Sequence, residues 1–287
     1  MRTILAMVGI SLFLAIAIPA SADTAVTACG MIDAPGTYLL EQNISNGPND
    51  ICIDIQSGGV VLDGQGHNIS GRSGSIGIRV PELVTTDPAN ESTDVEIRNV
   101  TVQDGVYGIY TGNDGTNISN VTLLNNYAGL FVAEAYQVVI RNSSLEGNGA
   151  GIDIADAILI AFSNQIVNNS VGVVIGPSLS GGGNIFYNNN FSNVDNYFIW
   201  SEDGPEGESV VLANTWNTTP GNTSNILGIE AFGGNYWGTP NGTGFSQTCT
   251  DADENGICDQ PFPLAANNTD WLPLTLPGNR TGAANTT

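Results

Sequence analysis

Lysine is absent from this 287-residue sequence, and positive charge is scarce altogether. The chain has six arginines and one histidine but 28 acidic residues, which gives a formal net charge of −22. Such a protein cannot displace the cations that surround nucleic-acid phosphates, and an anionic membrane surface repels it. The composition therefore excludes nucleic acid and anionic lipid as partners, and it leaves cations, neutral glycans or simple solvation.

The sequence also lacks an apolar run long enough to span a membrane. Its N-terminal apolar stretch, Ile4 to Ile18, is about 15 residues long, whereas a spanning helix needs about 20. Arg2 before this stretch and Ala20-Ser21-Ala22 after it predict a signal peptide over residues 1–22. We expect an exported protein, secreted or at the cell surface, with no membrane insertion after cleavage and a mature net charge of −23.

The sequence does contain a repeat of 21 or 22 residues. Each copy joins short stretches of alternating apolar residues through turns rich in Asn, Asp and Gly. One Asn and one Gly recur in step, at Asn99, Asn120, Asn142 and Asn164, and at Gly108, Gly129, Gly151 and Gly172. A constant period made of short strands predicts an all-β solenoid whose coils stack through parallel pairing.

Stacking assigns a structural role to the repeated residues. We expect one interior column of Ile97, Ile118 and Ile140, and another of Ile109, Leu130 and Ile152. The Asn column is predicted at a bend, with each side chain bonded to the backbone and to the Asn above it, too enclosed for glycosylation at its sequons. The Gly column indicates either an unusual φ or a close backbone approach. None of these residues is assigned a catalytic role.

The repeat sets the predicted organisation of the chain. We expect an N-terminal cap and first coils over 23–57, a parallel β-helix over 58–232, a C-terminal cap over 233–273 and a disordered tail over 274–287. The period lengthens between Val80 and Asp94, which predicts an inserted surface loop. The segment GGNYWG, Gly233 to Gly238, is expected to close the apolar stack.

Four cysteines lie in the mature chain, and export predicts that they form disulfides. Three pairings are possible. We favour Cys29 with Cys52 and Cys249 with Cys258, because each pair closes a loop at one end of the solenoid.

The most specific local motif is CTDADENGICD, Cys249 to Asp259. It matches the first nine positions of a calcium loop and resembles the disulfide-pinned calcium loops of thrombospondin type 3 repeats. Position 12 of an EF-hand would be Phe262, so the bidentate Glu is missing. We predict structural Ca²⁺ binding, with a solvated acidic turn as the alternative; the ligands would be Asp251, Asp253, Asn255, Asp259 and the carbonyl of Ile257.

Catalytic candidates are few. Asp63 and His67 lie four residues apart in DGQGH, but the flanking glycines indicate a turn, and we favour a structural role. Asp153, Asp156 and the acids of a loop from Ser201 to Ser209 are the carboxylates that a glycosidase on this fold would use.

Val60 to Gly71, the 21 to 22-residue coils and the GGNYWG ending resemble NosD-like right-handed parallel β-helix proteins of the carbohydrate-binding and sugar-hydrolase type, as found in secreted or surface proteins of methanogenic archaea. The resemblance implies copper delivery or polysaccharide cleavage. One His and three Met supply few soft ligands for copper. Uronate lyases need a cationic base, usually Lys or Arg near Ca²⁺, and the chain has no Lys.

These observations lead to one main functional hypothesis and two alternatives. We expect a non-catalytic cell-surface or extracellular protein that binds glycans or other envelope components. A polysaccharide-degrading enzyme is the first alternative, and it predicts carboxylates and aromatics along one outer face, with Tyr107, Tyr110, Tyr127 and Tyr136 as candidates. A self-assembling sheath or surface-layer subunit is the second.

Overall fold

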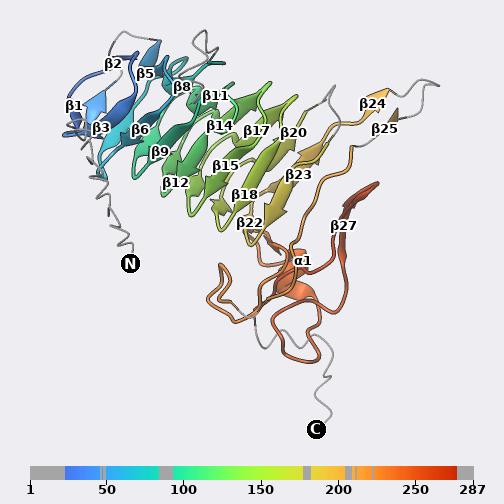
Figure 1. Ribbon diagram of the computed structural model, residues 1–287. Helices are drawn as coiled ribbons and strands as arrows, with labels where there is room; N and C mark the ends of the chain where they lie inside the picture. Colours follow the sequence, from blue (N-terminus) through green and yellow to red (C-terminus); the bar gives the residue numbers. More distant parts are fainter. Residues whose placement is uncertain are drawn as a thin grey trace, which may run out of the picture.

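The computed structural model describes residues 23–45, 47, 50–83, 93–176, 182–203, 209–210, 212–221 and 223–276. These residues form a right-handed parallel β-helix in which successive coils add strands to three parallel sheets (Figure 1). The predicted signal peptide, most of the inserted loop between Val80 and Asp94, and residues 277–287 of the predicted tail lie outside the described residues.

Each sheet contains eight strands, and we number the sheets in the order in which a coil visits them. Sheet 1 has the order β1 (Thr24–Val26), β3 (Gly36–Leu40), β6 (Val60–Asp63), β9 (Val95–Arg98), β12 (Asn117–Ser119), β15 (Val138–Arg141), β18 (Leu159–Phe162) and β21 (Ile185–Tyr187). Sheet 2 has the order β26 (Tyr236–Gly238), β22 (Asn190–Ser192), β19 (Gln165–Val167), β16 (Ser144–Glu146), β13 (Thr122–Leu124), β10 (Thr101–Gln103), β7 (Asn68–Ser70) and β4 (Ile44–Ser45). Sheet 3 has the order β2 (Gly30–Ile32), β5 (Ile51–Ile55), β8 (Ile76–Val80), β11 (Tyr107–Thr111), β14 (Ala128–Ala133), β17 (Ala150–Ala155), β20 (Val171–Ile175) and β23 (Asp195–Ile199). The other described elements are the hairpins β24 (Glu202–Asp203) with β25 (Ser209–Val210) and β27 (Phe262–Ala265) with β28 (Asn268–Asp270), and the helical turn α1 (Phe245–Thr248).

The apolar interior follows the predicted columns. Ile97 pairs with Ile118 and Ile118 with Ile140 on sheet 1, while Ile109, Leu130 and Ile152 are paired in the same way on sheet 3. All six side chains are fully buried. One coil has no second layer against which to bury these residues, so the interior exists only because neighbouring coils supply it.

The predicted Asn bends are confirmed, but their side chains do not stack as expected. Asn99, Asn120 and Asn142 have left-handed φ values of 54°, 54° and 52° where sheet 1 gives way to sheet 2. In this conformation the side chains of Asn120 and Asn142 are exposed, so the prediction that these sequons are enclosed is wrong. Asn164 is out of register by one residue, because Ser163 takes the left-handed position, with φ 57°.

Stacked amides form at other positions. In the first of three ladders, each Nδ2 donates to the Oδ1 one coil along at 2.9–3.1 Å, through Asn126, Asn148, Asn169 and Asn193. The second ladder joins Asn164, Asn189 and Asn235, and the third joins Asn184, Asn214 and Asn268. Members also donate to backbone carbonyls, as Asn148 does to Leu123 at 2.9 Å. The ladders satisfy amides that would be costly to bury alone.

The glycine column is explained by close approach. Gly108, Gly129 and Gly151 do not have a left-handed φ. A Cβ on each would lie 2.7, 2.8 and 2.6 Å from the carbonyl oxygen of Gly129, Gly151 and Gly172, respectively. The repeat therefore keeps glycine because the next coil's backbone occupies the space of a side chain.

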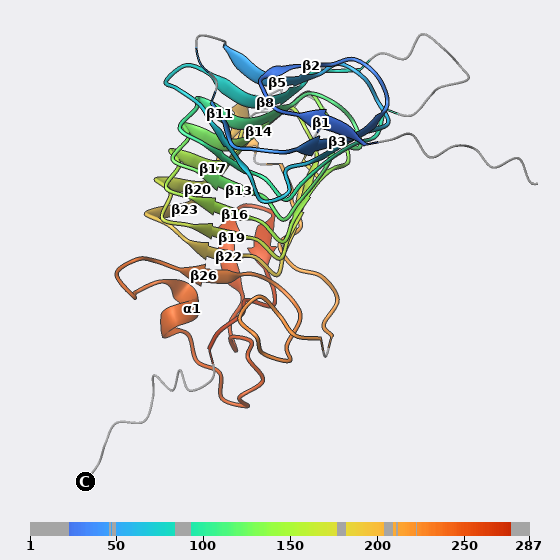
Figure 2. The same cartoon turned by 90° about the vertical axis from the view of Figure 1, so that its left-hand side faces the viewer.

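The two ends of the β-helix differ. At the N-terminal end the edge strands β1, β2 and β4 are the last members of their sheets, whereas loops, α1 and the β27–β28 hairpin gather at the C-terminal end (Figures 1 and 2). There Trp237 is fully buried and stacks on Phe191 with ring centroids 4.7 Å apart, and Trp216 stacks on Phe186 at the same distance. GGNYWG thus closes the stack as predicted.

Both favoured disulfides, Cys29–Cys52 and Cys249–Cys258, are present. Residues 226–232, where the β-helix was predicted to end, form turns and bends and an isolated bridge from Phe232 to Gly221, and they contain no strand. No helix in the described part of the chain is both long and apolar enough to cross a membrane.

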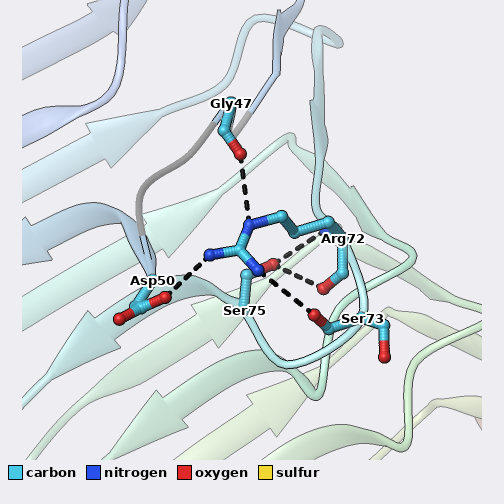
Figure 3. A network of polar contacts seen from close by, with 5 residues as sticks. All are labelled: Gly47, Asp50, Arg72, Ser73 and Ser75. Atoms are coloured by element: carbon cyan, nitrogen blue, oxygen red, sulfur yellow. Dashed lines mark hydrogen bonds and ion pairs between the residues drawn. The ribbon is translucent and has the colours of Figure 1, made fainter.

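Arginine side chains tie successive coils together. Arg72, in the turn between β7 and β8, donates to Asp50 at 2.7 Å and to the carbonyl of Gly47 at 3.2 Å, both in the preceding coil (Figure 3). Ser75 closes the same turn by accepting from the Arg72 N–H at 2.8 Å. The guanidinium thus links the turn between β7 and β8 to two positions of the preceding coil. The Arg72–Asp50 ion pair is exposed, so it contributes only about 0–1 kcal/mol to stability.

Candidate functional site

The outer face of sheet 3 carries three aromatic rings on neighbouring strands. Tyr107 and Tyr110 of β11 are both partly exposed, while Ile109 between them is buried, because the close approach at Gly108 interrupts the alternation. Phe131 of β14 pairs with Tyr110 in register. Its ring centroid lies 4.7 Å from that of Tyr107 and 5.6 Å from that of Tyr110. We call these three rings the aromatic cluster.

Charged residues flank the aromatic cluster along one row of the sheet. Asp54, Arg79, Tyr110, Phe131 and Asp153 are register neighbours on β5, β8, β11, β14 and β17. Arg79 donates to both carboxyl oxygens of Asp54, at 2.8 and 2.7 Å. Burial raises the pKa of Asp54, but the hydrogen bonds and charge of Arg79 outweigh it, and the net pKa is lowered. One flank is therefore a neutralised ion pair.

The other flank is the half-buried carboxylate of Asp153. Burial raises the pKa of Asp153, and the hydrogen bond from the backbone N–H of Ile154 only partly opposes this. The pKa of Tyr107 is raised as well, first by burial and then by the negative charge of Asp153 and by Tyr127. Asp153 and Tyr127 thus both lie within electrostatic reach of Tyr107.

Sequence reasoning found part of this face. Tyr107 and Tyr110 belong to the aromatic cluster, and Tyr127 lies beside it with 69% of its surface exposed. Tyr136 does not belong to it, because this residue lies in the connection between β14 and β15, where its N–H donates to Asp114 at 2.7 Å. Phe131 was missed, although it follows Leu130 as Tyr110 follows Ile109, and this spacing is visible in the repeat.

A hollow lies at the bend between sheets 1 and 2. Its volume is about 510 Å³, and its walls are uncharged, formed by Gln65, Gly66, Asn99, Val100, Thr101, Asn120 and Thr122. The hollow offers amides and hydroxyls but no aromatic ring. We therefore place the candidate site on sheet 3.

The acidic loop of the C-terminal cap brings three predicted ligands together. Carboxylate oxygens of Asp251, Asp253 and Asp259 lie within 4.8 Å of one another. Buried Asp251 accepts the backbone N–H groups of Asn255 and Gly256 at 3.0 and 2.9 Å, which folds the loop around this carboxylate. The Cys249–Cys258 disulfide closes the loop from outside.

The Asn255 side chain folds back onto the same loop. Its Oδ1 accepts the Ile257 N–H at 2.8 Å, and its Nδ2 donates to Asp253 at 2.9 Å. Three carboxylates within reach of one point form a hard oxygen set of the kind that Ca²⁺ prefers.

The match to a protein family covers the β-helix itself. The model of a family described as periplasmic copper-binding protein (NosD) matches residues 42–242, more than two thirds of the chain. The chain belongs to the NosD family. No curated protein and no solved structure matched the chain.

The donor set of this NosD-family protein does not fit copper. All four cysteines are in disulfides. His67 Nδ1 lies 3.3 Å from Asn43 Oδ1, and Met31, the methionine among the described residues, lies on β2, an edge strand of sheet 3. Copper sites in proteins draw on imidazole and on thiolate or thioether sulfur, and these donors are not gathered in the described part of the chain.

The remaining catalytic candidates make structural contacts. Buried Asp63 accepts from the Gln65 N–H at 3.0 Å, from Arg98 at 2.9 Å and from Asn99 at 3.1 Å. Burial raises the pKa of Asp63, but these hydrogen bonds and the charge of Arg98 outweigh it, and the pKa is lowered. His67 and Asp63 therefore bind different partners.

Asp156 follows β17 with a left-handed φ of 48°, in the bend after the strand. Residues 204–208 of the predicted acidic loop lie outside the described residues.

Proposed function

We propose that this NosD-family protein is exported by its predicted signal peptide and binds glycans, without catalysis, at the cell surface or in the extracellular envelope. The observation that carries the proposal is the aromatic cluster on the outer face of sheet 3, Tyr107, Tyr110 and Phe131. A sugar ring has an apolar C–H face and a rim of hydroxyls. Aromatic rings pack against the C–H face, and flanking polar groups such as Asp153 form hydrogen bonds with the hydroxyls.

The spacing of carboxylates supports binding over hydrolysis. Asp54 and Asp153 belong to the same outward row, but three strands separate them. At about 4.8 Å per strand they are roughly 19 Å apart. A carboxylate-pair glycosidase needs about 5–9.5 Å between its two groups. Asp54 also forms an ion pair with Arg79. This row therefore does not supply the second carboxylate that hydrolysis requires.

The first prediction concerns glycan affinity. Replacing Phe131 by alanine removes the ring that contacts both tyrosines, and we expect affinity for a bound polysaccharide to fall about 30-fold, equivalent to about 2 kcal/mol. Phe162→Ala is the matched control, because Phe162 stacks on Tyr187 at 5.1 Å on sheet 1, away from the cluster. Binding to a panel of neutral and acidic polysaccharides, measured by calorimetry on the Ca²⁺-loaded mature protein, checks this.

The same panel separates the alternatives. An equal loss from both variants, or no binding at all, would contradict the proposal. New reducing or unsaturated ends that disappear in Asp153→Asn or Asp156→Asn would instead identify a polysaccharide-degrading enzyme. Concentration-dependent sedimentation of polymers would favour a sheath or surface-layer subunit.

We also propose that the acidic loop binds one structural Ca²⁺ ion. Asp251, Asp253 and Asp259 supply the carboxylates that are grouped in the structure, and Gly256, with φ 82°, permits the sharp turn between them. Asn255 and the Ile257 carbonyl complete the predicted ligand set. The bound ion would neutralise three close carboxylates and fix the cap that covers the end of the β-helix.

The second prediction is that Ca²⁺ raises thermal stability. At a free concentration 100 times the dissociation constant, Ca²⁺ stabilises the folded protein by about 2.7 kcal/mol, which raises Tm by about 5–10 °C. Asp253→Ala removes one exposed carboxylate of the group and should abolish most of this rise. Asp33→Ala removes an exposed carboxylate near the other end and should leave it unchanged. Scanning calorimetry with Ca²⁺ and with a chelator measures this rise in Tm. Equal Tm values of the wild type under the two conditions would refute the Ca²⁺ site.

A further inference from the structure

The Asp153 carboxylate is half buried on the outer face of sheet 3 and forms no ion pair in the described part of the chain. Its register neighbours are Phe131 on β14 and Val174 on β20, both apolar. The adjoining row contributes Ala128 and Ala150, whose methyl groups cannot hydrogen-bond to it. The protein therefore keeps a negative charge among apolar groups at the edge of the aromatic cluster.

Elsewhere in the described chain, three aspartates are matched with arginines of the next coil. Arg72 pairs with Asp50, Arg79 with Asp54 and Arg98 with Asp63, at 2.7–2.9 Å. In each pair the arginine comes one coil after the aspartate. At the equivalent position one coil after Asp153 the chain has Val174 instead. Asp153 thus lacks the arginine partner that these three aspartates have.

Aromatic rings lie on one side of the same carboxylate. Phe131 precedes Asp153 in its row, Tyr107 stacks on Phe131 at 4.7 Å, and the charge of Asp153 acts on Tyr107 together with Tyr127. Aromatic faces attract cations, and a carboxylate forms its strongest hydrogen bonds with charged donors. The rings of Phe131 and Tyr107 beside one unpaired carboxylate form a set of groups that suits an ammonium ion.

We propose that the outer face of sheet 3 recognises a glycan that contains a free amino sugar, with the ammonium group held between Asp153 and the rings of Tyr107 and Phe131. This inference rests on the proposed glycan-binding function and names its ligand class. The face of an adjacent sugar packs on Tyr110 and Phe131, which continue the row along the axis. A linear chain of sugars lying across successive strands meets the rings first and the carboxylate next.

A sugar polymer fits these observations better than a cationic peptide. The rings form one cluster on neighbouring strands, in which Tyr107 stacks on Phe131 and Tyr110 is tilted against both. Such a cluster offers apolar area to successive sugar units. Asp153 is the unpaired carboxylate next to the rings, because Asp195 in the adjoining row lies two strands farther along, on β23. A polylysine segment would need several carboxylates beside the rings. The acidic net charge attracts any cation, so the experiment must separate general attraction from specific recognition.

The experiment compares four probes of equal length on the Ca²⁺-loaded mature protein at about 0.15 M salt, which screens the general charge. The probes are oligomers of β-linked glucosamine, the same oligomers fully N-acetylated, glucose oligomers and oligolysine. The variants are Asp153→Asn, Phe131→Ala and the control Asp195→Asn, an exposed carboxylate on β23 of the same sheet. Asp153→Asn keeps the size of the side chain, and circular dichroism confirms that each variant folds.

We expect the glucosamine oligomer to bind at least tenfold more tightly than its acetylated form. Asp153→Asn should remove that difference, Phe131→Ala should weaken all sugar probes, and Asp195→Asn should change nothing. If the acetylated and free forms bind equally and Asp153→Asn has no effect while Phe131→Ala still weakens both, the amino-sugar assignment is overturned and the glycan-binding function stands. If no sugar binds, both are overturned. If oligolysine equals glucosamine in affinity and in its response to Asp153→Asn, the ligand class is wrong.

Discussion

Gly151→Ala is expected to destabilise the β-helix by about 3 kcal/mol, because the added methyl group has no room. Its Cβ would lie 2.6 Å from the carbonyl oxygen of Gly172 and 2.8 Å from Cγ2 of Ile166. The oxygen belongs to the backbone of the next coil, whose position is fixed by pairing of β17 with β20. Relief requires the coils to separate locally, which weakens the contacts that bury Ile152 as well. Overpacking of this kind costs about 1–3 kcal/mol, and a backbone obstacle places it at the upper end.

Gly30→Ala is the matched control for this substitution. Gly30 lies on β2 of the same sheet, and nothing approaches within 4 Å of the position of its Cβ. Alanine there should leave stability unchanged or raise it by about 0.4–1 kcal/mol, because alanine has less conformational freedom when unfolded. Urea unfolding followed by circular dichroism measures both variants. A Gly151→Ala protein as stable as Gly30→Ala would show that coil spacing is not what selects glycine.

Asp270→Ala is expected to cost about 3 kcal/mol or more at neutral pH, through the C-terminal cap. The Asp270 carboxylate is fully buried and accepts from the Asn235 N–H at 2.7 Å, the Trp237 indole at 2.9 Å and the Leu272 N–H at 3.0 Å. Truncation leaves three buried donors without an acceptor, and each costs about 1–3 kcal/mol. Because Trp237 closes the apolar stack, its loosening exposes the last coil as well.

The effect of Asp270 should depend on pH in a defined direction. Burial raises its pKa from 3.8 to about 6, against the opposing hydrogen bonds from Asn235, Trp237 and Leu272. The folded protein therefore holds a proton that the unfolded chain releases between about pH 4 and pH 6. The contribution of this group to stability is greatest near pH 4 and decreases as pH rises to about 6, by up to about 3 kcal/mol.

Unfolding free energies at pH 4.5 and pH 7 check both statements. The unfolding free energy lost in Asp270→Ala relative to wild type should be larger at pH 4.5 than at pH 7. The loss in Asp195→Ala, which removes an exposed carboxylate, should be the same at both pH values. A difference that grows with rising pH would mean that Asp270 is stabilised as a charged group, contrary to the expected direction.

The solenoid and its packing columns were predictable, whereas the ladders were not. Repetition at 21 or 22 residues identifies Ile97 with Ile118 and Ile109 with Leu130, because a stacked coil places equivalent residues above each other. The period alone does not say which of several asparagines per coil turns inward. Asn120 and Asn126 both recur, but only Asn126 is buried in a ladder.

The candidate site was partly visible as well. Tyr107 and Tyr110 were predicted on an outer face, and Asp153 was named as a candidate carboxylate of a glycosidase. Phe131 occupies the position of Tyr110 in the next coil. That these four residues form one surface follows from the register of β11, β14 and β17, which is a property of the stacked coils. The acidic loop could be recognised from its alternating oxygen side chains alone, since all its members lie within eleven residues.

What the sequence by itself determined is local or periodic: the coil length, the buried columns, the glycine positions, the two disulfides and the composition of the acidic loop. Only the tertiary structure decided which asparagines face inward, how the aromatic cluster meets Asp153, and how the cap is closed. The physical reason is the range of the contacts. Asn214 bonds to Asn268 across 54 residues, and Asp270 binds Asn235 across 35, without any repeat that relates the partners. Such contacts leave no period in the chain, because they form between segments that meet only after the coils have stacked.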